Sequence, residues 1–156
     1  MPILATNKRA NFDYEILDKY EAGLVLFGHE VKAVRAGNVS LSGSYITFKA
    51  GPAGLPEAFL VNTHISLYKH TSGIADYDPT RTRKLLLGRK EIERLVNKKQ
   101  EQGLTLVPLN IYTKNSFLKL QFGVARGKKR YDKREDIKRK DLDRDRRRAL
   151  KGERLD

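Results

Sequence analysis

The last 31 residues of the chain, 126–156, carry too much charge to contribute to a folded core. They hold 15 of the 32 Lys and Arg residues and eight acidic residues, and their few apolar side chains form no continuous stripe. Burial of apolar surface is the main force that drives folding. We therefore predict a folded domain over residues 1–125 and a basic C-terminal tail over residues 126–156.

The net charge of +13 is unevenly distributed along the chain. Residues 1–125 contribute +6 (17 basic, 11 acidic) and residues 126–156 contribute +7 (15 basic, 8 acidic). Phosphate is the abundant cellular partner for such an excess, because neutralising it releases condensed counterions. A membrane surface is a poorer match, because the tail has no Trp or Phe anchor and no lipidation motif. The charge therefore indicates a nucleic acid as the partner, and no membrane partner is expected.

Several classes of protein are excluded by composition. The chain has no cysteine, so disulfides, thiol catalysis and cysteine-ligated zinc are ruled out. No apolar run approaches the roughly 20 residues that a membrane-spanning helix needs. The first residues lack the positive-then-apolar order of a signal peptide. These features predict a cytoplasmic protein.

The hydrophobic pattern predicts a mainly β domain. Gly37 and Gly103 end two helical patterns, at residues 30–36 and 89–102, as C-terminal caps. About six strands are expected, at residues 12–20, 24–27 and 44–49, one or two over 58–68, and a hairpin of 104–113 and 117–125. A turn at 21–23 is expected to join the first two strands. This order suits a small, closed or partly open β-barrel like the oligonucleotide-binding fold, with two or three short helices.

The tail has helix-forming pairs but nothing of its own to pack against. Acid-first pairs at i,i+4 each favour a helix by roughly 0.2–0.5 kcal/mol. They are Glu135–Arg139, Asp136–Lys140 and Asp143–Arg147, opposed by like charges at Lys140–Arg144. Helix nucleation is costly without tertiary contacts. We expect the tail to be disordered in the free protein and to become helical on the surface that it binds.

Enzymatic motifs are weak. Residues 123–129 faintly resemble a phosphate-binding loop, but the spacing between the glycines is one residue short and Lys129 replaces the Ser or Thr that holds magnesium. His29, His64 and His70 have no metal-ligand spacing. We predict no enzymatic activity, no cofactor and no metal site.

Binding motifs are stronger. Residues 81–84 place three cations directly before Leu85, Leu86 and Leu87. Three successive leucines in an extended segment cannot all face one core, so at least one should be exposed, and an apolar contact flanked by cations suits RNA. Five cations in residues 128–134 surround Tyr131, as phosphate contact combined with base stacking requires. A solvated charged surface remains the alternative for both segments.

Blocks of sequence from Asn7 to Arg148 resemble, in the same order, the SmpB family of SsrA-binding proteins. They are residues 7–10, 20–23, 30–32, 35–37, 78–87, 103–109 and 127–134. The blocks Arg-Thr-Arg-Lys-Leu-Leu-Leu and Gly-Leu-Thr-Leu-Val-Pro-Leu are the most specific. The chain departs from the usual pattern at Ala33-Val34, where Ser-Leu is common, and at Tyr131, where several members carry His.

The resemblance implies a non-enzymatic RNA-binding factor of trans-translation. Proteins of this family bind the tRNA-like domain of tmRNA (SsrA RNA) and deliver it to 70S ribosomes stalled on messages that lack a stop codon. The tail is expected to enter the empty mRNA channel and contact small-subunit rRNA at the decoding centre. Elongation factor Tu carrying alanylated tmRNA is a further implied partner, and the protein is expected to be a monomer. The alternative function is a basic structural ribosomal protein whose tail threads rRNA.

The resemblance also implies two sets of site residues. The residues that fall where the family contacts tmRNA or its phosphates are Asn7, Lys8, Arg9, Glu21, Lys32, Arg35, Arg83, Lys84 and Leu86. Those that fall where it engages the decoding centre and mRNA channel are Gly127, Lys128, Lys129, Tyr131, Asp132, Lys133 and Arg134.

Overall fold

The computed structural model describes residues 2–74, 76–101, 103–128 and 130–150, with the side chains of 130–132, 149 and 150 outside the description. Seven strands form one antiparallel sheet in the order β1-β8-β9-β2-β7-β5-β4. They are β1 (Ile3–Thr6), β2 (Tyr14–Leu24), β4 (Tyr45–Ala50), β5 (Pro56–Val61), β7 (Arg83–Leu86), β8 (Leu104–Lys114) and β9 (Phe117–Gly127). A separate pair is formed by β3 (Val39–Ser40) and β6 (His64–Ile65).

The large sheet curves into a small barrel. Strand β4, at one end of the strand order, packs against β8 near the other end. Alternate residues of the long strands face inward, as Leu118, Leu120 and Phe122 of β9 do in the main core. The prediction of a mainly β chain built as a small barrel is confirmed.

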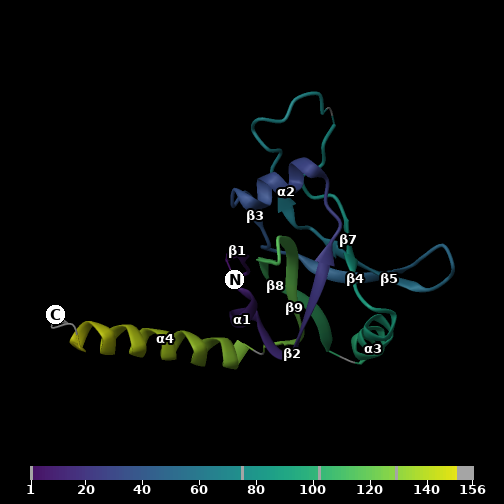
Figure 1. Ribbon diagram of the computed structural model, residues 1–156. Coiled ribbons are helices and arrows are strands. Elements are labelled where there is room, and N and C mark those ends of the chain that lie inside the picture. Colours follow the sequence, from purple (N-terminus) through teal and green to yellow (C-terminus); the bar gives the residue numbers. More distant parts are fainter. Residues whose placement is uncertain (1, 75, 102, 129, 151–156) are drawn as a thin grey trace.

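Four helices accompany the barrel in the described part of the chain. They are α1 (Ala10–Asp13), α2 (Gly28–Arg35), α3 (Arg89–Gln100) and α4 (Arg130–Leu150). Helix α3 places Leu95 fully inside the core. Figure 1 shows α2 and α4 at opposite ends of the barrel, with α4 projecting away from it. Helices α2 and α3 match the two predicted helices, while α1 and the strand β1 were not predicted.

The predicted turn at residues 21–23 is wrong, and so is the strand at 24–27. Strand β2 continues through the turn to Leu24, pairing Gly23 with Lys119 on one side and with Leu86 on the other. Gly23 suits this position because an added Cβ would lie 3.2 Å from Leu86 Cβ. The glycine therefore serves close packing between strands rather than a change of direction.

The tail follows the barrel directly. Strand β9 runs to Gly127, so the barrel extends two residues past the predicted boundary at residue 125. Residues 130–150 form the helix α4, and the start of α4 contacts α1. That the tail is disordered in the free protein and becomes helical on the surface that it binds stays a prediction.

Candidate RNA-binding surfaces

A shallow apolar hollow opens on the outer surface of β2, β7 and β9, next to α2. Its volume is about 230 Å³. We name it the Leu86 hollow after its most prominent predicted residue; its lining is Gly23, Leu24, Leu26, Val31, Arg35, Leu86, Ser116, Phe117, Leu118 and Lys119. Leu86 is 55% exposed and Phe117 is 67% exposed, which leaves two large apolar side chains open to solvent.

The alternation of β7 explains why Leu86 is exposed. Arg83 and Leu85 point inward and are buried, whereas Lys84 and Leu86 point outward. The prediction that at least one of the three leucines is exposed is confirmed. An apolar side chain beside cations is the combination that a stacked nucleobase and its phosphates require.

Cations border the Leu86 hollow. Arg35 of α2 donates a hydrogen bond from Nη2 to the Ser116 carbonyl oxygen (2.8 Å), in the turn between β8 and β9. That turn uses left-handed backbone at Asn115 and Ser116, with φ of 51° and 68°. Lys119 lies on the neighbouring strand opposite Gly23, and Lys32 is exposed on α2. Arg35 and Lys119 therefore place positive charge at the edge of the apolar floor.

Glu21 is the acidic member of this surface. It lies two residues before Gly23 on the same face of β2 and accepts a hydrogen bond from the Tyr112 hydroxyl. Lys114 Nζ lies 3.4 Å from its other oxygen. The Tyr112 hydrogen bond lowers the pKa of Glu21, and burial together with the carboxylate raises the pKa of Tyr112 to about 12. Glu21 is thus ionised and held in place at neutral pH.

Arg83 does not belong to the exposed surface, so its prediction as a phosphate contact is wrong. Its side chain is 0% exposed and forms an ion pair with Glu30 of α2 at 2.6 Å. It also donates to the Pro79 carbonyl oxygen (2.9 Å) and the Tyr77 hydroxyl (3.0 Å). Because Arg83 occupies an inward-facing position of β7, its guanidinium lies in the interior.

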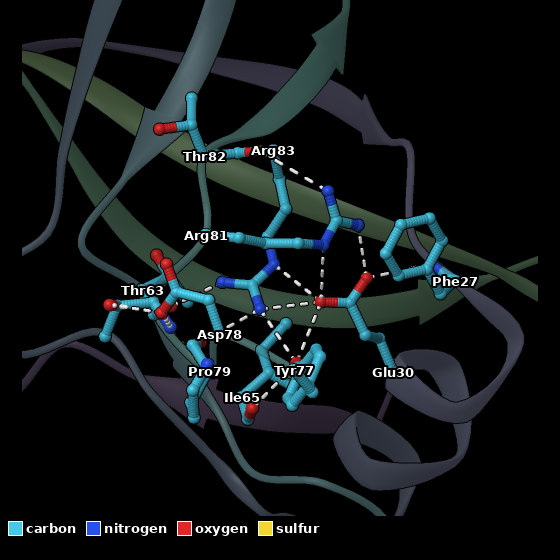
Figure 2. Close-up of polar contacts among 11 residues, drawn as sticks. Phe27, Glu30, Thr63, Ile65, Tyr77, Asp78, Pro79, Arg81, Thr82 and Arg83 are labelled. Atoms are coloured by element: carbon cyan, nitrogen blue, oxygen red, sulfur yellow. Dashed lines mark hydrogen bonds and ion pairs between the residues drawn. The ribbon is translucent and has the colours of Figure 1, made fainter. Parts of the chain in front are cut away.

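Glu30, Tyr77, Arg81 and Arg83 form a cluster that we call the Glu30 network, in which Glu30 and Arg83 are buried and Tyr77 and Arg81 are partly exposed. Figure 2 shows both guanidinium groups and the Tyr77 hydroxyl meeting at the Glu30 carboxylate. Burial alone would raise the pKa of Glu30, but hydrogen bonds from Arg81, the Phe27 backbone N–H and Arg83 lower it to about 2. The network ties α2, and with it Lys32 and Arg35, to β7.

The remaining predicted tmRNA residues lie elsewhere. Lys84 is exposed on β7 beside Leu86 and pairs with Glu57 at 3.4 Å. Asn7 donates from Nδ2 to the Pro108 carbonyl oxygen (2.9 Å), while Lys8 is exposed. Arg9 pairs with Asp13 of α1 at 3.4 Å. The predicted set therefore divides between the Leu86 hollow and the end of the barrel from which α4 leaves.

The predicted decoding-centre residues lie at the root of the tail. Gly127 ends β9, and Lys128 pairs with Asp136 of α4. Lys133 lies 3.4 Å from Asp13, and Arg134 is exposed. Lys129 and the side chains of Tyr131 and Asp132 lie outside the described residues.

The residues around the Leu86 hollow lie far from those at the root of the tail. Tyr14 and Gly23 belong to opposite ends of β2, and Tyr14 pairs with Gly127 at the tail end. At about 3.3 Å per residue, the nine steps between them span about 30 Å. The Leu86 hollow and the tail root are therefore separate surfaces on one barrel.

Comparison with protein families identifies the chain. A family model described as "SmpB protein" matches residues 4–152. The chain belongs to the SmpB family. Members named SsrA-binding protein include one from Gloeothece citriformis, 48% identical over 96% of this chain and 93% of the relative. Another, from Geobacillus thermodenitrificans, is 50% identical over 96% of this chain and 92% of the relative.

A solved structure gives the same assignment. It is described as "tmRNA-SmpB: a journey to the center of the bacterial ribosome" and matches with a TM-score of 0.66 and 45% identity. The match covers 88% of this chain and 95% of that chain. The fold and the family predicted from the sequence are thus confirmed.

For this SmpB family member, the sequence prediction missed several residues of the surface around the Leu86 hollow. Phe117 and Lys119 line the hollow, and Tyr112 and Lys114 contact Glu21. Strand alternation was the available signal for Phe117, because Leu118 and Leu120 face the core and their neighbour Phe117 therefore faces outward.

Within the described ranges, no group of three or more His, Asp or Glu side chains is arranged to hold a metal ion. None of the helices in those ranges is both long and apolar enough to cross a bilayer.

Proposed function

We propose that the chain is an RNA-binding factor of trans-translation, which binds the tRNA-like domain of tmRNA and brings it to ribosomes stalled on messages without a stop codon. The observation that carries this proposal is the presence of two separate cation-bearing surfaces, about 30 Å apart, on one barrel. The names of the relatives and the ribosome-bound SmpB support it.

In this proposal the barrel and the tail have different tasks. The Leu86 hollow offers an apolar contact for an exposed tmRNA base, and Arg35, Lys32 and Lys119 neutralise the nearby phosphates. Helix α4 enters the mRNA channel and meets small-subunit rRNA at the decoding centre. An occupied channel excludes the helix, so the factor acts only where the message has ended.

The proposed role is binding rather than catalysis, and it is carried out in the cytoplasm, where ribosomes translate. Elongation factor Tu with alanylated tmRNA is a proposed partner during delivery. Arg83, although part of a sequence block shared with the family, contributes through the Glu30 network and not through a phosphate contact.

Glu21 provides a test of specific tmRNA binding by the barrel. We expect Glu21→Ala to weaken tmRNA binding about tenfold, because a carboxylate can accept a hydrogen bond from a base amino group, a contact typically worth about 1–3 kcal/mol. Affinity for ordinary tRNA should not fall and should change by less than about twofold. The substitution removes a negative charge that repels phosphates, so general RNA binding is not weakened. Gel-shift titrations at one salt concentration measure both affinities.

Tyr112→Phe is the matched control for this test. It removes the hydroxyl that donates to Glu21 and keeps the carboxylate, so tmRNA binding should fall much less than with Glu21→Ala. If Glu21→Ala lowered the affinities for tmRNA and for ordinary tRNA equally, Glu21 would recognise no feature peculiar to tmRNA.

A further inference from the structure

The floor of the Leu86 hollow is a place where the outer surface of the sheet lacks a side chain. Gly23 of β2 pairs with Leu86 of β7 on one side and with Lys119 of β9 on the other. Residues that pair directly across neighbouring strands lie on the same face of the sheet. An added Cβ at Gly23 would lie 3.2 Å from Leu86 Cβ and 3.3 Å from Leu86 Cδ1. Leu86 therefore packs against bare backbone, and the floor of the hollow stays low.

Phe117 lines the hollow from the other side of β2. It belongs to β9 and Leu86 belongs to β7, and these two strands flank β2 in the sheet. Phe117 is 67% exposed, the largest exposed fraction among the large apolar side chains of the described residues. Leu24, Leu26 and Val31 extend the apolar lining. An apolar surface that is open to solvent and has charged residues at its edge is typical of an interaction site.

The backbone that carries Phe117 is held in place. Asn115 and Ser116 form the turn between β8 and β9, and both have left-handed backbone, as two-residue hairpin turns of type I′ require. Arg35 of α2 donates a hydrogen bond to the Ser116 carbonyl oxygen, a contact between residues 81 positions apart. The residue directly before Phe117 is therefore tied to α2. A ring on such a fixed backbone loses little conformational freedom when a ligand binds to it.

We propose that the Phe117 ring stacks on one unpaired nucleobase of the tRNA-like domain of tmRNA, and that this base lies over Gly23 between Phe117 and Leu86. The inference deepens the proposed function and rests on it. A base is flat and apolar on its faces, and RNA-binding proteins commonly stack unpaired bases on aromatic side chains. The base can approach the floor because a side chain at position 23 would occupy this space and displace Leu86.

The charged residues at the edge of the hollow favour RNA as its occupant. Arg35 and Lys119 line the hollow, and Lys32 is exposed on the same helix as Arg35. Phosphates flank every nucleotide, so a base in the hollow brings negative charge close to these cations. An apolar peptide segment could fill the hollow but would offer no phosphate to the cations. Arg35 thus has two tasks, because it positions the turn before Phe117 and attracts the RNA backbone.

Substitutions of Phe117 in the full-length chain separate stacking from simple apolar contact. Phe117→Ala should lower the tmRNA affinity about tenfold, because one base–aromatic stack is lost. Phe117→Leu keeps an apolar side chain without a ring and should lower it about fivefold, whereas Phe117→Tyr keeps the ring and should stay within about twofold of the parent. Because no charge changes, the dependence of each affinity on salt concentration should match the parent's, and the affinity for ordinary tRNA should change less than about twofold. Gel-shift titrations at several salt concentrations measure these quantities.

A fluorescence measurement detects the stack itself. The chain has no Trp, so Phe117→Trp introduces a single indole into the full-length protein. An indole that stacks on a base loses emission, and we expect saturating tmRNA to reduce the emission at least about twofold. Tyr45→Trp is the matched control, because Tyr45 is 43% exposed on β4 and lines a separate hollow with Asn7 and Arg9. The emission of this control should change by less than about a tenth, since no base stacks there.

Several results would overturn the proposal. They are parental tmRNA affinity with Phe117→Ala, an equal loss with Phe117→Tyr, or unchanged emission from Phe117→Trp when tmRNA is bound. The last of these would point to an apolar peptide as the occupant instead. Equal quenching in Tyr45→Trp would mean that RNA covers the barrel without a preferred base site. Equal binding of tmRNA and ordinary tRNA by the parent would refute the proposed function, while the emission of Phe117→Trp with either RNA would still decide whether a base stacks in the hollow.

Discussion

A chain that ends at Lys128 is expected to bind tmRNA within about threefold of the full-length affinity and to lose tagging of stalled ribosomes completely. The truncation keeps all of β9 but removes a net charge of +5 (13 basic, 8 acidic) together with α4. The Leu86 hollow lies about 30 Å from the tail root. That distance exceeds the Debye length of roughly 8 Å at physiological salt, so the lost charges act only weakly on the hollow.

Ile137→Pro in the full-length chain is the matched control for the truncation. It keeps every charge of the tail but interrupts α4, at a cost of about 3 kcal/mol to the helix. Tagging should again be lost while tmRNA binding is retained, which would show that the helix and not merely its charge is required. Normal tagging by the truncated chain would refute the division of tasks between barrel and tail.

Glu30→Gln is expected to destabilise the barrel by about 3 kcal/mol, measured as the free energy of unfolding in urea at pH 7. The substitution leaves the fully buried Arg83 without its counter-charge, and removing one partner of a buried ion pair typically costs 3–5 kcal/mol. Glu57→Gln is the control, because the Lys84–Glu57 pair is largely exposed and should contribute less than about 1 kcal/mol.

The same carboxyl group makes stability depend on pH. The pKa of Glu30 is about 2 in the folded protein, against an ordinary value of 4.5 that applies when the chain is unfolded. Between these values the unfolded state binds more protons, so stability is fully present above about pH 5 and falls as pH drops towards 2. A shift of this size corresponds to about 3 kcal/mol. The difference in unfolding free energy between the parent and Glu30→Gln should therefore shrink from pH 7 to pH 3. An unchanged difference would contradict the claim that the ionised Glu30 carboxylate stabilises the fold.

Much of the barrel could be predicted from hydrophobic alternation. The hairpin of β8 and β9 and the exposure of Leu86 follow from period-2 patterns and from the limits on packing three adjacent leucines. The same alternation places Arg83 inward with Leu85, once the strand is recognised. Its partner Glu30 could not be predicted, because the pairing joins residues 53 positions apart through the tertiary fold.

The error at Gly23 has a long-range cause. Gly23 resembles a turn residue, but the approach of Leu86 on the neighbouring strand explains its presence. Leu86 lies far along the chain, so local propensity alone leaves the conformation at Gly23 open.

A gel-shift titration at physiological salt, with tmRNA and an ordinary tRNA as separate ligands, tests the central claim most directly. If the surface around the Leu86 hollow recognises the tRNA-like domain of tmRNA, the full-length protein should bind tmRNA at least about tenfold more tightly than tRNA, and the chain ending at Lys128 should keep that preference. Equal affinity for the two RNAs would mean that the protein binds polyanions in general, and it would contradict specific recognition of tmRNA by this surface.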